Sequence, residues 1–531
     1  MAMAADSPSS SSSSGMARRL AHHHQAVLGF LLGLFVSLVL YTTMSGQFGS
    51  TKSVVVPQSM SGKRAEQNVR TSPPPVSSAP NNSIQGNVQV NTTYQLDQTV
   101  NDASDKMKGE LIRQELNQDG DGNDDGSNVK HGAPRKPICV LTDPRYDICE
   151  ISGDGRALGA NRTILYVPPA EERGSDGPEW AIKDQSRKYL SDIKEVNVKT
   201  LSAAQSLVAP ECTSRHTVPA VVFAMNGIIG NPWHDFSDLL LPLFITTRAY
   251  EGEVQFLVTE LQPWFVDKYR LILTNLSRYD IVDFNKDIGV RCYPHIIVGL
   301  RSHGDLSIDP ARTPQNYTML DFRLYMRDIF SLPWDGQGIP YKEKANKKNA
   351  TGGIDDGTEK QKPRLMLINR GWNRKFVNLP EISAAVQAAG FELLVVEPLR
   401  DTRLEEFSRE VDSCDVLMGA HGAALTSFFF LRTNAVMLQV VPWGLKREAM
   451  IYFGVHVKEM MLQDIEYSIT VEESTLYEKY GKDHPAIRDP DSIHKQWWQG
   501  ARKYFWEEQD IRLNVSRFAP TLHQLLQTLR E

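Results

Sequence analysis

Residues 415–431 read DVLMGAHGAALTSFFFL. The apolar run DVLMG (415–419) predicts a strand, and GAALTSFFFL (422–431) predicts a helix that follows a glycine-rich turn. Such a junction presents unpaired backbone N–H groups and the positive end of a helix dipole to an anion. The candidate anion contacts are Gly419, His421, Gly422 and Ala423. Taken alone, the turn is equally compatible with tight packing around a hydrogen-bonded histidine.

The neighbouring segments repeat the strand–helix pattern. The expected strands are RLMLINR (364–370), FELLVVEP (391–398) and AVMLQVV (435–441), and the expected helices are LPEISAAVQAAG (379–390) and RLEEFSREVDSC (403–414). This succession is typical of a doubly wound α/β domain, whose ligands lie at the carboxyl ends of its strands. The turn matches neither G-x-G-x-x-G nor a P-loop, and it has no Ser or Cys at the elbow position. A dehydrogenase, a kinase and a hydrolase are therefore disfavoured.

Three polar residues follow the first strand of this domain at intervals of four. They are Arg370, Arg374 and Asn378, in LINRGWNRKFVNLPE (367–381). If the segment is helical, the three side chains share one face, and the two guanidiniums can hold a diphosphate through forked hydrogen bonds. A solvated basic helix end is the alternative interpretation.

The chain before this domain shows the same alternation. Apolar runs occur at 138–142, 163–167, 220–225, 254–258 and 296–300. Helix-like stretches such as 235–250 lie between several of them, which predicts a largely parallel sheet. A charged, glycine-containing segment at 341–362 marks a domain boundary or a long loop.

The N-terminus carries an apolar run. Residues 26–44 are uncharged and follow Arg18 and Arg19, which favours an uncleaved transmembrane anchor over a cleaved signal peptide, with the rest of the chain in a lumen. Ser, Asn, Gln, Pro and Asp dominate residues 45–136, which predicts a disordered stem. Seven N-x-[ST] sequons are consistent with a luminal body: Asn81, Asn91, Asn161, Asn275, Asn316, Asn349 and Asn514.

The five cysteines give an independent expectation about redox state. In an oxidising compartment four of Cys139, Cys149, Cys212, Cys292 and Cys414 are expected to pair. Cys414 is the expected free thiol, because it lies between a predicted helix and a buried strand.

The charge balance and acidic motifs exclude some ligands. With 58 basic and 64 acidic residues the net charge is −6, so no overall basic field for nucleic acid exists. An Asp-x-Asp motif, Asp119-Gly-Asp121, lies in the predicted stem. No metal and no other cofactor are therefore expected.

A base for proton transfer is predicted in NPWHDFSDLLLP (231–242). His234 and Asp238 are four residues apart, so on one helical turn the carboxylate can orient the imidazole. His234 can instead be a mere hydrogen-bonding group, and His303 with Asp305 is the rival pair. Candidate sugar-stacking rings are Trp233, Trp372 and Trp443.

Several of these blocks resemble glycosyltransferase family 61, in its plant branch that decorates xylan. The blocks are IN-R-x-x-x-R-x-x-x-N-x-x-E from Ile368, GAHGAALTS (419–427), QVVPWG (439–444), CEISGDGR (149–156), GNPWHDFSDLLLPLF (230–244), RCYPHIIVGLRSHGDLSIDP (291–310) and the EES of VEESTLYEKY (471–480). Within it, Asn231, His234 and Asp238 match an Asn-x-x-His-x-x-x-Asp pattern. The resemblance implies a GT-B fold, a UDP-sugar donor, inversion at the anomeric carbon and a single-pass type II protein of the Golgi membrane.

The predicted fold class is therefore α/β and GT-B, with two Rossmann-like domains facing a cleft, preceded by one transmembrane helix and a stem. The expected parts are a cytosolic tail (1–25), a signal anchor (26–44), a disordered stem (45–136), an N-terminal acceptor domain (137–340), a linker or loop (341–362), a C-terminal nucleotide-sugar-binding domain (363–500) and a C-terminal helix that packs back (501–531).

The expected activity is transfer of a pentose, arabinofuranose or xylose, from a UDP-sugar to xylan or its arabinosyl side chains. Arg370, Arg374, Asn378 and His421 are expected at the diphosphate or ribose of the donor, and His421 is not the expected base. The alternative is an inactive, membrane-anchored carbohydrate-binding scaffold. Expected partners are the UDP-pentose, xylan and the Golgi membrane, with an oligomer of xylan-synthesis enzymes left open.

Overall fold

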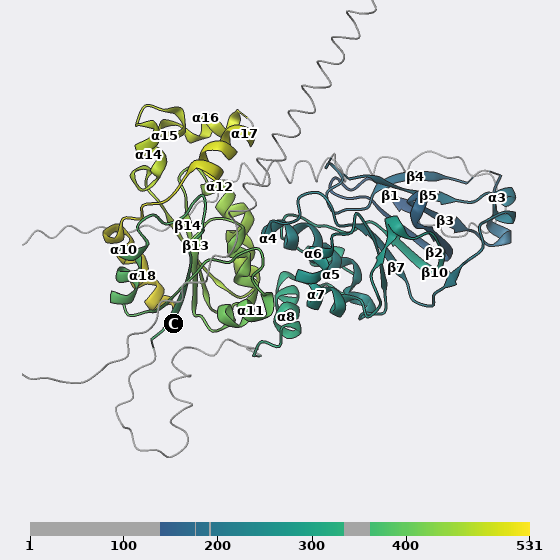
Figure 1. Cartoon of the computed structure of the whole chain (residues 1–531), viewed down its shortest axis with the longest axis horizontal. Helices are drawn as coiled ribbons and strands as arrows, with labels where there is room; N and C mark the ends of the chain where they lie inside the picture. Colours follow the sequence, from purple (N-terminus) through teal and green to yellow (C-terminus); the bar gives the residue numbers. More distant parts are fainter. Residues whose placement is uncertain (1–137, 176, 191–192, 334–361, 497, 531) are drawn as a thin grey trace, which may run out of the picture. The chain divides into compact units, whose positions relative to one another are not determined.

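The computed structural model describes residues 138–175, 177–190, 193–333, 362–496 and 498–530. These residues form a mixed α/β structure with two separate sheets (Figure 1). The predicted tail, anchor and stem lie outside the described residues, as do Asn81, Asn91, Asn349 and most of 341–362. The sequons at Asn161, Asn275, Asn316 and Asn514 are all exposed.

The predicted localisation needs correction. No helix in the described part of the chain is both long enough and apolar enough to cross a membrane. The structure thus gives no support for a single-pass protein of the Golgi membrane, and the span expected at 26–44 is not among the residues it describes.

The first sheet has ten strands and runs β4-β5-β3-β2-β10-β7-β8-β9, with β1 beside β2 and β6 beside β10. The strands are β1 (Cys139–Val140), β2 (Ile148–Leu158), β3 (Thr163–Val167), β4 (Glu179–Lys183), β5 (Glu195–Thr200), β6 (Ser214–Arg215), β7 (Ala220–Ala224), β8 (Gln255–Thr259), β9 (Val282–Asp283) and β10 (Val290–Val298).

This sheet differs from the largely parallel one that the sequence predicts. Strands β10, β7, β8 and β9 are mutually parallel, whereas β2 pairs antiparallel with both β10 and β3, and β4 with β5. The burial pattern of the strands gives the physical reason for this difference. β7 is buried throughout, as parallel strands covered on both faces are, while β4 and β5 alternate between buried and more exposed residues.

Short helices accompany the first sheet. They are α3 (Ala203–Leu207), α4 (Pro232–His234), the π-helix η3 (Asp235–Leu240), α5 (Leu241–Thr247), α6 (Pro263–Lys268), α7 (Arg270–Leu276), α8 (Met319–Ile329) and the 3-10 turns η1 (Gly159–Asn161), η2 (Ala170–Glu172), η4 (Arg248–Tyr250), η5 (Phe284–Lys286) and η6 (Pro310–Arg312). Because α4, η3, α5 and η4 follow one another without a break, residues 232–250 form one continuous helical run.

The second sheet is fully parallel, in the order β12-β11-β13-β14-β15. Its strands are β11 (Arg364–Ile368), β12 (Glu392–Val396), β13 (Val416–Ala420), β14 (Val436–Val441) and β15 (Gln463–Ser468). Four of the five begin within two residues of a predicted strand, and only β15 was not predicted. Successive residues of β11, β13 and β14 pack into two different cores, so this sheet is doubly wound as the sequence predicts.

Helices cover both faces of the second sheet. The elements are α10 (Leu379–Ala388), α11 (Leu404–Asp412), the 3-10 helix η7 (Ala423–Phe430), α12 (Lys446–Ala449), the π-helix η8 (Met450–Gly454), α13 (Val455–Glu459), η9 (Val471–Glu473), α14 (Thr475–Tyr480), α15 (Pro485–Arg488), α16 (Pro490–Lys495), α17 (Trp498–Ala501), the π-helix η10 (Arg502–Glu508) and α18 (Val515–Thr528). In Figure 1, α10 and α18 lie together on one face and α11 lies on the other.

The cysteines behave as predicted. Cys139 pairs with Cys149 and Cys212 pairs with Cys292, and Cys414 is a buried free thiol. Burial raises the pKa of the Cys414 thiol to about 11, so it stays protonated and behaves as a small apolar side chain.

Two buried arginines of α8 join the two sheets. Arg323 is fully buried and donates to the carbonyls of Leu431 and Met460, while Arg327 donates to the carbonyls of Phe430 and Leu431. A single apolar core also runs from α4, α5 and α8 to η7 and α11. The helices of the first sheet therefore pack against η7, the helix that follows β13.

Replacing Arg323 by methionine tests this junction. Methionine keeps the apolar stem but leaves the buried carbonyl of Met460 without this donor and that of Leu431 with Arg327 alone, so we expect a loss of roughly 3 kcal/mol in the free energy of unfolding. Equilibrium urea unfolding measures the change. Arg403→Met, at the residue that precedes α11, is the matched control, because its side chain is 72% exposed, and it should cost less than about 0.5 kcal/mol. Equal midpoints for the two variants would contradict the junction.

Candidate active site

The turn after β13 brings two arginines to one point. Gly422 has φ +153°, and a Cβ at this position would lie 2.8 Å from Nη1 of Arg370 and 2.9 Å from Nη1 of Arg374. Only glycine accommodates this backbone and this close approach. Arg374 also donates from Nη1 to the carbonyl of His421, at 2.8 Å. The two guanidiniums therefore meet directly above the start of η7.

The helical face predicted for residues 370–378 is wrong. The segment is an irregular loop, and Arg374 itself has φ +57°, in the left-handed region. Backbone strain of this kind is costly and is found where the surrounding structure holds a functional side chain. The amide N–H of Arg374 donates to the carbonyl of Gln509, which holds the loop in place.

The arginine pair is electrostatically uncompensated. Among the described residues neither Arg370 nor Arg374 forms an ion pair with a carboxylate, and Nε of the buried Arg374 has no hydrogen-bond partner. Burial, with repulsion from Arg370, lowers the pKa of Arg374 to about 9. Burial also lowers the pKa of Arg370. Two buried cations without a counter-charge form a site for an anion.

His421 is neutral and carries its proton on Nδ1. Its Nδ1 lies 2.7 Å from Oε1 of Gln439, whose own amide nitrogen donates to the carbonyl of Ala449. The imidazole therefore donates from Nδ1, and Nε2 keeps its lone pair. Burial lowers the pKa of His421 to about 3, so the ring is neutral. Nε2 has no partner in the described residues and can accept a hydrogen bond.

Trp506 completes this part of the site, and sequence reasoning missed it. Its ring lies 4.8 Å from Cζ of Arg374 and 5.3 Å from the ring of His421, and its buried Nε1 has no described partner. The residue belongs to η10, in a segment that the sequence suggested only as packing. No local motif distinguishes it from a core tryptophan.

Three other predicted contacts have structural roles. The Asn378 side chain bonds to the backbone of Leu513 and to Glu381, so it does not join the arginines. Gly419 is a buried strand residue whose missing side chain makes room for Leu425 and Ile368. Ala423 is the first residue of η7.

The predicted pair His234 and Asp238 is formed. Nδ1 of His234 lies 2.7 Å from Oδ2 of Asp238. A carboxylate only accepts, so Nδ1 carries the proton and Nε2 of the partly exposed imidazole is left as an acceptor. Asp238 lies in the π-helix η3, and such wide turns are often found at functional sites. Asn231 is not a direct participant, since its side chain caps α4 by accepting from the N–H of Trp233.

Asp238 is held in place by a second residue that sequence reasoning missed. Nε of Arg187 donates to Oδ1 of Asp238 at 2.7 Å, and its Nη1 donates to the hydroxyl of Tyr189. Burial alone would raise the pKa of Asp238, but the hydrogen bond from His234 and the charge of Arg187 outweigh it and lower that pKa. The carboxylate is thus ionised and fixed in orientation. Arg187 follows β4 in a region without any recognisable motif.

The rival base pair is not formed. Nδ1 of His303 accepts the N–H of Asp309, so the proton of the neutral ring is on its buried Nε2. Burial lowers the pKa of His303 to about 4. Asp305 does not contact it and instead accepts from Arg145 at 2.6 Å and from Arg187 at 2.8 Å. Neither residue has a free basic atom comparable to Nε2 of His234.

A chain of aromatic rings links the two halves of the site. Trp233 lies 4.9 Å from the ring of His234 and 4.8 Å from that of Tyr452, and its Nε1 donates to the carbonyl of Tyr452. Tyr452 in turn stacks 6.3 Å from His421. Trp233 is therefore buried in the junction and cannot serve as a sugar platform. Trp443 donates to the carbonyl of Ala486, and Trp372 is 67% exposed.

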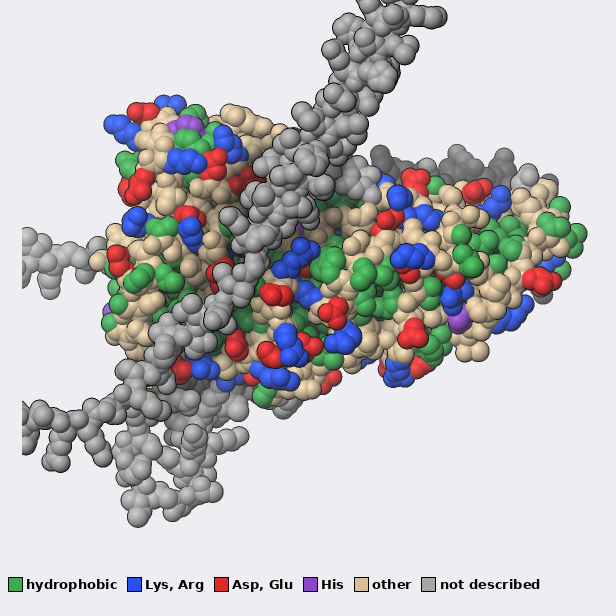
Figure 2. Space-filling model, in the orientation of Figure 1, with side chains coloured by type: hydrophobic (Ala, Val, Ile, Leu, Met, Phe, Trp, Pro, Cys, Tyr) green, Lys and Arg blue, Asp and Glu red, His purple; other side chains and the backbone are tan. Residues whose placement is uncertain are grey.

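The surroundings favour a local anion site over a charged surface. Figure 2 shows Lys and Arg side chains interspersed with Asp and Glu over the visible face.

Within the described residues, one group of potential metal ligands is found, Asp154 with Cys212 and Cys292. These cysteines form a disulfide, so they cannot supply thiolates.

An α/β protein that joins an oriented histidine to two uncompensated arginines has the parts of an enzyme that transfers a group from an anionic leaving group. The comparisons with known proteins agree. The model of the glycosyltransferase 61 family matches residues 234–438, which include both parts of the site. The chain belongs to the glycosyltransferase 61 family.

Several named relatives are plant enzymes. The alpha-1,3-arabinosyltransferase XAT2 of Oryza sativa subsp. japonica is 39% identical over 402 residues, 75% of this chain and 65% of the relative. The beta-1,2-xylosyltransferase XYXT1 of the same organism is 39% identical over 410 residues, 74% and 84% of the two chains. The xylan glycosyltransferase MUCI21 of Arabidopsis thaliana is 32% identical over 388 residues, 72% and 78%.

Inorganic pyrophosphate tests the arginine pair without reference to any reaction. It should raise the thermal unfolding temperature at neutral pH, because it supplies the missing counter-charge. The pKa of Arg374 is lowered to about 9, so the cation is present below this pH and is lost as the pH rises through it. The stabilisation should fade accordingly. Thermal scans of the wild type and of Arg374→Met across this range measure the effect. An undiminished stabilisation well above pH 9 would refute it.

Proposed function

We propose that this chain is an inverting glycosyltransferase that transfers a pentose, arabinofuranose or xylose, from a UDP-sugar to xylan or its arabinosyl side chains. The observation that carries the proposal is the junction of the His234–Asp238 pair with the Arg370–Arg374 pair through Trp233, Tyr452 and His421. A base and an anion site on one continuous wall are what direct displacement at an anomeric carbon needs.

His234 is the base in this proposal. Nε2 removes the proton of the acceptor hydroxyl while that oxygen attacks the anomeric carbon of the donor. Asp238 holds the ring in the required tautomer and stabilises the imidazolium that forms. Arg187 keeps the carboxylate in position and balances its charge, so it acts as a positioning residue.

The arginine pair acts on the leaving group. As the bond from the anomeric carbon to the diphosphate breaks, negative charge develops on UDP, and the guanidiniums of Arg370 and Arg374 stabilise it. Nε2 of His421 accepts and cannot donate in the neutral ring. A hydroxyl of the ribose therefore suits it better than a phosphate oxygen.

The fold and the cofactor requirement belong to the same proposal. The two sheets would be the halves of a GT-B enzyme, with the donor on the parallel sheet and the acceptor on the mixed one. The cationic pair supplies the charge that a divalent metal supplies in other transferases, so turnover should survive a chelator. Glycosylation of the exposed sequons and assembly with other xylan-synthesis enzymes remain predictions.

The proposed donor sugar is one of two pentoses. Relatives named as arabinosyltransferases and as xylosyltransferases are equally similar to this chain, at 39% identity. The matched part is 65% of the XAT2 arabinosyltransferase. The transferred sugar, the linkage and the acceptor therefore depend on direct assay.

A UDP-release assay is the central experiment. Xylan oligosaccharides are supplied with UDP-arabinofuranose or UDP-xylose, and we expect turnover with one of the two, unchanged by a chelator. Arg374→Met should weaken UDP binding by about tenfold or more, the effect of losing a charge-assisted hydrogen bond. Calorimetric titration measures the affinity, with Arg403→Met as the matched control.

The outcomes separate the two function classes. UDP that binds without turnover for either donor would favour an inactive carbohydrate-binding scaffold. Unchanged UDP affinity in Arg374→Met would refute the arginine clamp. Loss of activity with the chelator would refute the metal-free mechanism.

The choice of base is tested with a matched pair of histidine variants. His234→Gln should lower kcat about 100-fold or more with little effect on UDP affinity, because it removes proton transfer and not donor binding. His303→Gln should leave kcat near that of the wild type. Steady-state rates with saturating donor decide between them. The reverse pattern would move the base to His303.

A further inference from the structure

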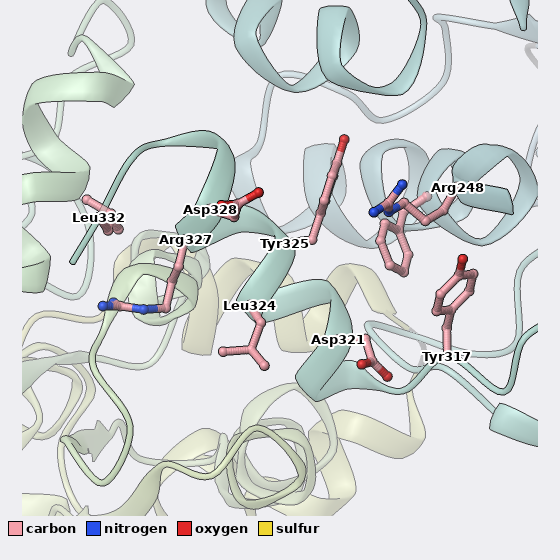
Figure 3. A pocket seen from close by; sticks show the side chains of 9 residues that line it. Arg248, Tyr317, Asp321, Leu324, Tyr325, Arg327, Asp328 and Leu332 are labelled. Atoms are coloured by element: carbon pink, nitrogen blue, oxygen red, sulfur yellow. The ribbon is translucent and has the colours of Figure 1, made fainter. Parts of the chain in front are cut away.

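A pocket lies between α5, η4 and α8, apart from the residues assigned to the reaction. Its volume is about 350 Å³, at the lower end of small-molecule sites, which span roughly 300–1,000 Å³. Figure 3 shows the residues that line it. They include Phe244, Arg248, Tyr317, Asp321, Tyr325 and Asp328.

Three aromatic rings form one wall of this pocket. The ring of Phe244 lies 5.3 Å from those of both Tyr317 and Tyr325. Phe244 is buried, whereas both tyrosines are partly exposed. Such a wall suits the apolar C–H face of a sugar ring, and the tyrosine hydroxyls add hydrogen-bonding capacity at its edge.

Two polar side chains of the pocket, Tyr325 and Arg248, are poorly satisfied by the described residues, whereas Tyr317 donates to Gln315 and Asp321 accepts from Thr318. The hydroxyl of Tyr325 is buried and has no hydrogen-bond partner in the described residues. Arg248 lies over the Tyr325 ring, with Cζ 5.2 Å from its centre, and makes no ion pair in the described part of the chain. In Figure 3 its guanidinium lies between the rings of Tyr325 and Tyr317. An unsatisfied buried hydroxyl costs about 1–3 kcal/mol, which a ligand can recover.

The charges select the class of ligand. Asp321, Asp328 and Arg327 also line the pocket. Because Arg327 is already paired with Asp412 at 2.8 Å, an anion attracted to Arg248 would still meet two negative groups. A neutral polyol suits the whole set, because its hydroxyls donate to carboxylates and accept from Arg248 and Tyr325. The lining therefore fits a neutral sugar better than a phosphate.

We propose that this pocket is a second carbohydrate-binding site, which holds a sugar residue of a polymeric acceptor away from its reacting end. The inference rests on the proposed function for the nature of the polymer. His234 and Arg248 lie near opposite ends of the helical run 232–250. Their separation of fourteen residues corresponds to roughly 20 Å at the rise of an α-helix. A polysaccharide can occupy both sites, whereas a short oligosaccharide occupies one, and double occupancy raises the apparent affinity.

The experiment compares Arg248→Ala with Arg403→Ala as a matched control on two acceptors, polymeric xylan and a short xylo-oligosaccharide. Arg248→Ala should raise the KM for the polymer about tenfold, the effect of losing a charged hydrogen-bond donor, and leave the KM for the short acceptor and kcat unchanged. Tyr317→Ala, which removes one ring of the wall, should show the same pattern. An equal change on both acceptors, or no change on either, would overturn the proposal.

Direct binding keeps this test separate from the proposed reaction. Without any turnover, retardation in native gels that contain xylan still reports binding, and Arg248→Ala should migrate faster than the control. Equal migration would overturn the second site. The sequon at Asn316 precedes Tyr317, so a glycan on this asparagine is the competing occupant. If Asn316→Gln abolishes the difference between the wild type and Arg248→Ala, the pocket holds the chain's own glycan and the proposal fails.

Discussion

The buried guanidiniums of Arg323 and Arg327 hold the two sheets together. A buried charge must be compensated, and these two donate to backbone carbonyls of Phe430, Leu431 and Met460 on the other half of the fold. Arg327 also pairs with Asp412 at 2.8 Å. Since the accepting carbonyls lie at the end of η7 and beyond α13, the junction also places the turn around Gly422. The candidate active site thus depends on how the halves pack.

The two parts of that site have opposite electrostatic designs. Around Asp238 the charges are balanced, because Arg187 and His234 both donate to one carboxylate, which suits a group that must orient a base. Around Gly422 two buried arginines share no carboxylate among the described residues, and the pKa of Arg374 is lowered to about 9. Such an arrangement is unfavourable by itself, and the proposed diphosphate would relieve it.

Local patterns were enough for much of the fold. Apolar runs predicted β3, β7 and the central strands of the parallel sheet, because a buried strand consists mainly of apolar residues. They did not predict the antiparallel pairing of β2 with β10 and β3, or of β4 with β5, because pairing direction depends on partners distant in sequence. For the same reason the i,i+4 pair His234–Asp238 was predictable, while Arg187, Tyr189 and Trp506 were not.

The sequence alone predicted an anion site at Arg370, Arg374 and Gly422. A glycine after a strand and a pair of guanidiniums both favour anion binding. Only the tertiary structure shows how these residues are arranged in space. Arg374 reaches Gly422 from a left-handed loop and not from a helix, and Asn378 turns away to the Leu513 backbone. Nε2 of His421 is an acceptor because Oε1 of Gln439, eighteen residues later, accepts a hydrogen bond from the protonated Nδ1. The tautomer of a histidine and the approach of an arginine to a glycine both depend on neighbours that are distant in sequence. Only tertiary packing brings these neighbours within hydrogen-bonding distance.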